Sequence, residues 1–587
     1  MNKIYSKVWN CALAQVVVAS ELAARHRGGV VDRRGARHRL SPSRLSLGIL
    51  AGLIALGGAG WVERADAQAV DCSNTPWNVY NGTASCMGLQ SAASGTGATA
   101  IGSLAHANVL GALAVGYNSL STGQNGIALG FQAYTSAINS VYLGARTSPS
   151  TGATAGGAIG IGTDVTASGP NALAMGTLSI SASTNSVAFA NSSSVDTNSV
   201  NSIAIGYLTN VANSNNAVAL GSGSTVSGGT HATALGWQAY ATALNAIYLG
   251  ARTVGVGASG ASAVAIGTDV SVAGAEGIGM GLQANASNTD AIAIGTTSAA
   301  SGPQSTAVGR QTSASAQYGT ALGSNSAASG VAATAVGANA QASGASSVAA
   351  GQNNVANGDQ SIAIGLSTHA SGTASIAIGG NTAGGAASSS TNTIAIGSQS
   401  TASQGSAIAV GLLANATATN AVAMGAAANA SGNQTVALGY GSAASAINAV
   451  AIGLNATSSG ANAVAAGNAS KALAASTVAF GDSNTVAAAA GTGSIAGGHN
   501  SQVKGGTGAV ALGEGQTVTG NGAVAIGDPN IANGNGAVAM GSNNVAAGDA
   551  AGTTAADGAV AIGNSNQAIG QGSVALGDTS KALAAGA

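Results

Sequence analysis

The chain has 587 residues, 91 of them glycine, and a formal net charge of −1 at pH 7. Charged residues make up 6% and aromatic residues 3% of the sequence, which disfavours a conventional core of leucine and phenylalanine between amphipathic helices. Beyond residue 67 there are six Lys/Arg against thirteen Asp/Glu and only four widely spaced histidines, which argues against nucleic-acid binding and against an ordinary enzyme active site.

Residues 1–67 have the features of an export signal. An arginine-rich stretch precedes an apolar segment at 45–60, and Ala65-Asp66-Ala67 follows it. This order of basic, apolar and A-x-A elements predicts a signal peptide cleaved between Ala67 and Gln68. The alternative is an uncleaved membrane anchor, but this glycine-containing segment is shorter than the roughly 20 residues that span a bilayer.

Residues 1–23 lie ahead of that signal and contain the strings MNKIY, VWN and VVASELA. They resemble the extended signal peptide region of large autotransporters and related secreted proteins of Gram-negative bacteria. The resemblance implies export across the inner membrane, followed by delivery to the outer membrane or the cell surface.

Residues 68–97 are expected to form an N-terminal cap segment that contains Cys72 and Cys86. An even number of cysteines in an oxidising compartment predicts a disulfide between them. It would close a loop of about 15 residues and contribute on the order of 3 kcal/mol. The alternative is two free thiols, and two cysteines without a nearby histidine do not indicate a metal site.

From residue 98 onward one phrase recurs: a small or polar residue, then Val/Ile/Ala, Ala, Ile/Leu/Val/Met and Gly. Examples are SIAIG at 361–365 and AVAIG at 523–527. We count about 33 copies, mostly at 14-residue intervals, and a period this short indicates one stacked unit per repeat. Residues 98–587 are therefore predicted to form one all-β solenoid. Disordered Gly/Ala/Ser low complexity, the alternative, would not keep this registry.

Within each unit the apolar period is two, which indicates strands. Val436 and Leu438 should point one way and Ala437 the other, and each unit reads as strand, turn, strand, turn. Each 14-residue unit thus predicts one coil of a narrow parallel β-roll with small residues inside. The first strand is apolar on both faces, so its outer face would expose a continuous apolar stripe. Soluble proteins rarely leave such a stripe in water, and we therefore predict an obligate oligomer.

The phrases at 361–365 and 573–577 (SVALG) resemble the head repeats of trimeric autotransporter adhesins of the YadA type. The resemblance covers about 480 residues. It implies a left-handed parallel β-roll, a homotrimer, and attachment to host matrix proteins or cell-surface receptors. Members of this family continue into a neck, a stalk and a membrane anchor, whereas the sequence to Ala587 remains head-like. We expect outer-membrane display to depend on an anchor that is missing from this chain.

Several intervals are longer than 14 residues and predict outward loops, with neutral insertion as the alternative to a binding role. A longer block also recurs at an offset of about 105 residues. Its two copies supply our candidate ligand contacts, because aromatic residues and arginine dominate binding energetics: Phe131, Tyr134, Tyr142 and Arg146, and then Trp237, Tyr240, Tyr248 and Arg252. Alternatively, Phe131 and Trp237 fill a wider coil while the two arginines satisfy turn carbonyls or form ion pairs.

Catalytic motifs are not found: the sequence has no HExxH, no CxxC and no Walker-type loop. The glycine-rich run at 157–162 lacks a following helix and is interpreted as a turn. Aspartates are too sparse for calcium repeats. We therefore expect no enzyme activity, no catalytic residues, no cofactor, no metal and no small-molecule substrate. An adhesin head is the leading hypothesis; the alternatives are a passive spacer or surface coat and a carbohydrate-active β-helix enzyme.

Overall fold

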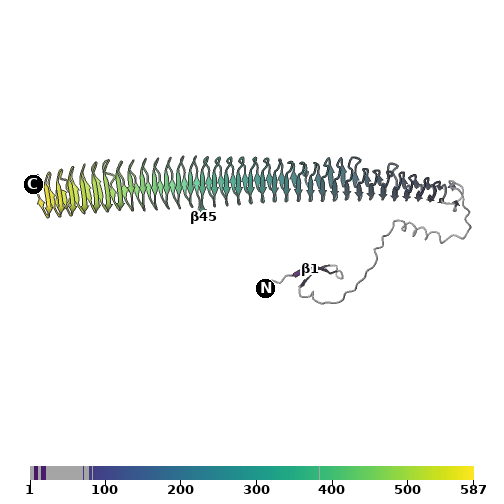
Figure 1. Ribbon diagram of the computed structural model, residues 1–587, viewed down its shortest axis with the longest axis horizontal. Coiled ribbons are helices and arrows are strands. Elements are labelled where there is room, and N and C mark those ends of the chain that lie inside the picture. The colour runs from purple at the N-terminus through teal and green to yellow at the C-terminus, as the bar shows by residue number, and fades with distance from the viewer. Residues whose placement is uncertain (1–4, 11–14, 21–69, 72–78, 82–83, 382–383) are drawn as a thin grey trace, which may run out of the picture. The chain divides into compact units, whose positions relative to one another are not determined.

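The computed structural model describes residues 5–10, 15–20, 70–71, 79–81, 84–381 and 384–587 (Figure 1). The chain divides into two units, Met1–Ala65 and Asp66–Ala587. In the first unit, β1 (Tyr5–Asn10) pairs antiparallel with β2 (Gln15–Ser20). The apolar segment at 45–60 and the cleavage site after Ala67 lie outside the described residues. Within the described ranges, no helix is long and apolar enough to cross a membrane.

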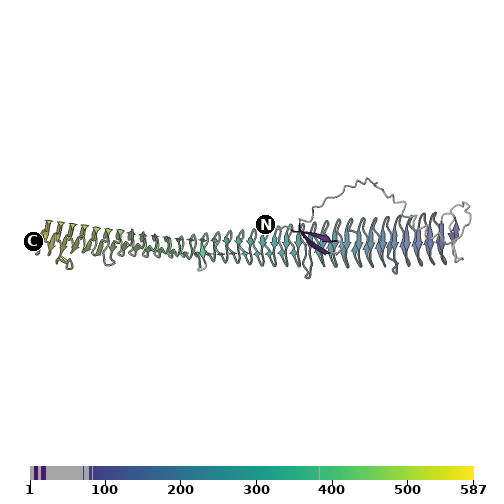
Figure 2. The same ribbon diagram turned by 90° about the horizontal axis from the view of Figure 1, so that it is seen from below.

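The second unit is a rod of stacked coils (Figures 1 and 2). Each coil contributes one strand to each of two parallel ladders. The first ladder runs from β5 (Ala84–Met87) to β72 (Val574–Asp578). The second runs from β6 (Ala92–Ala93) to β73 (Lys581–Ala582), with one interruption that Ala258 bridges. The described strands thus form an all-β parallel solenoid, and this part of the predicted fold is confirmed.

Strand length divides the first ladder into two regions. Its strands have three residues each from β7 (Thr99–Ile101) to β58 (Val464–Ala466). They have five residues each from β60 (Val478–Asp482) to β72. Successive strands of the first ladder stay in register; in one pair of neighbours Ile362 lies opposite Ile376. Equivalent residues of neighbouring coils therefore form columns along the rod.

The interior of each coil is filled by small side chains. In the coil of β42 (Ile362–Ile364) and β43 (His369–Ala370), four side chains point inward and are 0% exposed: Ser361, Ala363, Thr368 and Ala370. Two short strands closed by tight turns leave no room for larger groups between the opposite walls. The predicted alternation is confirmed, with alanine inside and isoleucine outside.

The turn after each first-ladder strand depends on glycine. Gly365 has φ +131°, and a Cβ added there would come within 2.4 Å of the Gly379 carbonyl oxygen in the next coil. Only glycine satisfies both the dihedral angle and this close approach. Ala190 stands where other coils have this glycine and has φ +110°, an unfavourable conformation for a residue with a Cβ.

The N-terminal end of the solenoid carries two antiparallel strands. β3 (Val70–Asp71) pairs with β6, and β4 (Val79–Asn81) pairs with β5. Both ladders therefore begin with an antiparallel pair within the segment expected to form a cap. Parallel stacking starts with β5, ahead of the predicted boundary at residue 98.

Candidate functional site

An apolar stripe follows the outer face of the first ladder. In β42 the Ile362 side chain is half-buried and Ile364 is 40% exposed. The third residue of the other first-ladder strands takes the same outward position. Its most exposed members are Leu129, Phe189, Leu220, Leu235, Met280, Leu322, Val336, Ile364, Ile396, Met424, Ile452, Phe480, Met540, Ile562 and Leu576. An exposed apolar stripe of this extent is unusual on the surface of a chain in water.

The two copies of the duplicated block each contain an inserted loop that is held by an aspartate from the following coil. In the first copy, Asp164 accepts hydrogen bonds from the Thr147 backbone N–H and hydroxyl and, at 2.9 Å, from the Ser148 N–H. The Thr147 hydroxyl is the largest cause of a lowered pKa of the Asp164 carboxyl. In the second copy, Asp269 holds Thr253 and Val254 in the same way.

A third inserted loop, at residues 549–554, uses the same device within itself. Asp549 accepts from the Thr553 N–H at 3.0 Å and from the Thr553 hydroxyl at 2.7 Å. Hydrogen bonds from Thr554 and Thr553 hold the pKa of the Asp549 carboxyl far below its usual value. Each of these three insertions thus has an aspartate–threonine clip, in which a carboxylate accepts from the backbone N–H and the hydroxyl of one threonine.

The arginines of the duplicated blocks contact their own loops. Arg146 lies over the Tyr134 ring, 4.8 Å from its centroid, and donates to the Pro149 carbonyl. Arg252 lies 4.4 Å from the Tyr240 centroid and donates to the Gln238 and Val256 carbonyls at 2.9 and 3.1 Å. The alternative prediction, in which these arginines satisfy turn carbonyls, describes the observed contacts.

The aromatic candidates divide into exposed and buried residues. Phe131 and Trp237 are 46% and 48% exposed, so they do not fill a wider coil. Tyr142 and Tyr248 are 0% exposed and donate to the Ala145 and Ala251 carbonyls at 3.0 and 2.9 Å.

Burial is the main cause of the raised pKa of both tyrosines, Tyr142 and Tyr248. The structure therefore corrects our prediction for them, because a ligand on the surface of this chain cannot reach their rings. The alternation of side chains in the sequence could have predicted this burial, because Tyr142 stands at the inward position that alanine occupies in other coils, such as Ala128 in the preceding one.

The insertions leave the rod at two different turns. The loops at 146–151 and 252–257 and the short antiparallel pair β45 (Gly380–Asn381) and β46 (Gly384–Gly385) follow a first-ladder strand. The loops at 487–493 and 549–554 follow a second-ladder strand. Short loops that project from the ladders are visible in Figure 2. The expectation that extra residues form outward loops at turns agrees with this placement.

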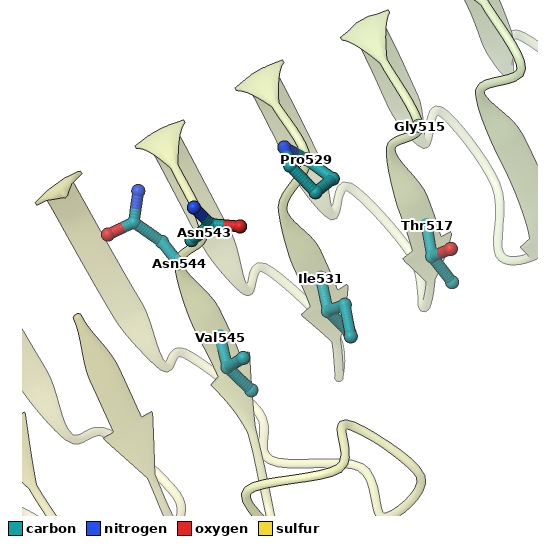
Figure 3. Close-up of a pocket in the computed structure, with 7 residues that line it drawn as sticks. All are labelled: Gly515, Thr517, Pro529, Ile531, Asn543, Asn544 and Val545. Atoms are coloured by element: carbon teal, nitrogen blue, oxygen red, sulfur yellow. The ribbon is translucent and has the colours of Figure 1, made fainter. Parts of the chain in front are cut away.

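The C-terminal coils carry a shallow groove that we did not anticipate (Figure 3). Thr517, Ile531 and Val545 line it from β65 (Thr517–Thr519), β67 (Ile531–Asn533) and β69 (Val545–Ala547), and Pro529 and Asn543 flank them. The hollow has a volume of about 230 Å³, and its lining contains no ionisable side chain. Its lining therefore provides no side chain that could act as a general acid or base.

Ionisable groups are sparse in the described part of the chain. His499 lies 2.7 Å from the Glu514 carboxylate and 3.9 Å from Asp482, and all three side chains are about half exposed or more. Among the described residues, no group of three or more His, Cys, Asp or Glu side chains is arranged to hold a metal ion. Cys86 in β5 is 3% exposed and takes part in a disulfide. Because Cys72 lies outside the described residues, the Cys72–Cys86 pairing stays a prediction.

A rod of stacked coils with a small-residue interior is a repeat solenoid. Comparison with protein families matches the YadA head domain repeat over more than half of the chain, at residues 93–119, 121–147, 167–189, 198–224, 212–239, 227–253, 273–298, 300–326, 328–354, 356–382, 388–414, 416–442, 430–456, 444–470, 458–484, 519–544, 555–580 and 568–587. The chain therefore belongs to the family of trimeric autotransporter adhesins with YadA head repeats.

The leader matches a second family. Residues 1–50 correspond to the Extended Signal Peptide of Type V secretion system, which confirms the resemblance seen in MNKIY and VVASELA. Leader and head repeats together indicate export to the surface of a Gram-negative cell. A comparison with curated proteins gives no match.

Proposed function

We propose that this chain forms the head of a homotrimeric surface adhesin that attaches the bacterium to host cells, extracellular matrix or other surfaces. The observation that carries the proposal is the apolar stripe, which one protomer leaves open along the whole first ladder. The coil interior is already filled by alanine, serine and threonine, so the stripe cannot be buried within its own chain. Packing against other protomers would bury the stripe and remove it from water.

Trimerisation supports adhesion through multivalency. Each coil adds the same columns of side chains, so a rod of three chains presents every outer surface three times and at many heights. Individually weak contacts then act together, because the second contact forms at a high effective concentration. The family match supports the number three and the adhesive role, and the left-handed winding of the coils is proposed on the same basis.

A passive spacer is the second candidate. It is supported by a row of asparagines on the outside of the rod whose side chains form hydrogen bonds with each other, which leaves fewer of their polar groups for a ligand. Asn171 donates to Asn185, and Asn185 donates to Asn201, at 3.1 and 3.0 Å. Such amide ladders stabilise a rod without providing recognition.

The first experiment measures the solution mass of residues 68–587 by light scattering, with circular dichroism on the same fractions. A mass three times that of the protomer with a β spectrum is expected. The same material, immobilised on beads, should then bind matrix proteins or host cells saturably. A monomer contradicts the trimer, whereas a trimer without saturable binding favours the spacer.

A further inference from the structure

Exposed aromatic side chains are concentrated on one edge of the solenoid. We call the first-turn edge the column of residues that directly follow the turn glycine after each first-ladder strand. Five residues on it are between 46% and 62% exposed: Tyr117, Phe131, Tyr207, Trp237 and Tyr440. Tyr117 and Phe131 are stacked with ring centroids 5.5 Å apart. Because the coils stay in register, these residues form one discontinuous row along the rod.

Two places on this edge have the same construction, one from each copy of the duplicated block. Each has an exposed aromatic residue, a neighbouring glutamine and a clipped loop in the next coil. The Arg146 N–H donates to the Phe131 carbonyl at 2.8 Å, and the Arg252 N–H donates to the Trp237 carbonyl at 2.9 Å. Seven coil steps separate them in the ladder, which at the usual strand spacing is about 34 Å.

The surface around these two places carries almost no free charge. Between residues 84 and 253, only four side chains other than histidine are charged: Arg146, Asp164, Asp196 and Arg252. Both arginines bond to loop carbonyls and lie over tyrosine rings, and Asp164 holds its loop. Asp196 accepts from the Asn198 and Asn213 backbone N–H groups at 3.1 and 2.9 Å. These four side chains are therefore engaged by contacts within the chain, which favours a neutral ligand over a highly charged one here.

What this edge offers is aromatic surface beside neutral hydrogen-bonding groups. Gln132 and Gln238 follow Phe131 and Trp237 directly, and Gln238 is exposed. The apolar C–H faces of a sugar ring pack against an aromatic ring, while its hydroxyls bond to amides and carbonyls. The clipped loops fix this surface before binding, which lowers the entropy cost of association.

We propose that the two places, centred on Phe131 and Trp237, bind a neutral polysaccharide that runs along the rod and occupies both. The inference rests on the proposed function, because it requires a head exposed at the cell surface. A repeating polymer fits the repetition: two surfaces of similar construction on one rod can hold two segments of one chain, and the second contact is intramolecular.

Affinity electrophoresis of the mature chain tests the proposal. The native protein is run through gels that contain a mannan, a soluble β-glucan or dextran, with heparin as a polyanion and a soluble proline-rich peptide as a polypeptide probe. At least one neutral polysaccharide should retard the protein. Phe131→Ala and Trp237→Ala should each weaken retardation about tenfold, and the double variant should weaken it further.

Three controls separate recognition from folding. Tyr440→Ala removes an exposed aromatic of the same edge that has no clipped loop beside it, and should change retardation less than twofold. Trp237→Phe keeps an aromatic surface and should retain most of the binding. Solution mass and circular dichroism of Trp237→Ala should equal those of the parent.

Several results would overturn the inference. They are retardation by heparin alone, binding to the peptide probe alone, no retardation by any of the three neutral polysaccharides, or loss of oligomer mass in Trp237→Ala. The last result would make the edge a contact between protomers. Both places lie within one chain, so the gels remain informative if the protein is monomeric and the proposed trimer fails. A trimer that binds cells but no polysaccharide would contradict the polysaccharide proposal and leave the proposed adhesin function intact.

Discussion

At the residue scale, Ala190 shows how strictly the turn glycine is required. Its φ of +110° lies where a Cβ crowds the neighbouring backbone, while equivalent coils have glycine. We expect Ala190→Gly to stabilise the solenoid by about 1 kcal/mol through relief of this strain. Thermal unfolding monitored by circular dichroism measures the change.

The matched control is Ala188→Gly in the same strand. Ala188 points inward and is 0% exposed, so removal of its methyl group should lower stability. Equal effects of the two substitutions would contradict strain at Ala190.

The aspartate clips predict acid sensitivity of the inserted loops. The pKa of Asp269 lies below its ordinary value of 3.8, and the Thr253 hydroxyl is the largest cause. A lowered native pKa contributes stability above the unfolded pKa, and this contribution is lost as the pH falls through the native pKa. The loop at 252–257 should therefore stay closed at neutral pH and loosen below about pH 4.

Hydrogen exchange of the Thr253 and Val254 amides measures this opening. At pH 7, Asp269→Asn should lower the protection of these two amides, measured relative to the intrinsic exchange rate, to that of the parent loop in acid, because an amide oxygen replaces only one of the two acceptor oxygens. The Thr553 amide, held by Asp549, should not change. Slow Thr253 exchange in the variant would show that backbone packing, not the clip, holds the loop.

At the scale of elements, the five-residue strands near the C-terminus coincide with a buried amide ladder. Asn544 donates to the Asn530 side chain and to the Met540 and Gly563 carbonyls at 2.8–2.9 Å. Its own side-chain oxygen accepts from the Asn566 backbone and side chain. A single amide thus satisfies polar groups of neighbouring coils that would otherwise be buried without partners.

Asn544→Ala should therefore destabilise these coils by about 2–3 kcal/mol, since several buried groups lose their partner at once. Asn429→Ala is the control: Asn429 lies on the outer face of β53 (Asn429–Ala430) and is exposed, so its change should stay within about 0.5 kcal/mol. Calorimetry compares the two. If Asn544→Ala unfolded at the same temperature as the parent protein, water would have to replace the hydrogen bonds of the missing amide, and the prediction would be wrong.

At the scale of the whole molecule, the apolar stripe that the coils create is the surface through which we expect the protomers to assemble. Interactions in a solenoid are additive between neighbours, so one polar substitution should open the proposed trimer locally and several should weaken it overall. Ile294→Asp with Ile364→Asp should reduce oligomer mass or lower its Tm, whereas Asn339→Asp on the polar turn should do neither. Light scattering at increasing temperature measures both. Equal, negligible effects would contradict the outward orientation of these isoleucines.

The general architecture could be predicted because each coil is specified locally. In Ser361–Gly365, side-chain size and alternation alone decide that Ala363 points inward and Ile364 outward. Contacts between coils could not be read in this way. Asp164 reaches Thr147 from 17 residues further along the chain, and only the stacking of one coil on the next brings them together.

The sequence by itself determined the parallel coil, its small-residue interior, the apolar stripe and the export signal, because all four follow from short-range pattern and side-chain volume. The tertiary structure decided which aromatic residues face solvent, how the inserted loops are held and where the amide ladder lies. Alternation marks Tyr142 as inward, but only the structure shows what makes room for its ring: Gly160 of the next coil lies opposite it, where an added Cβ would come within 3.0 Å of the ring. The physical reason is that these outcomes depend on the space and the hydrogen-bond partners that the next coil provides.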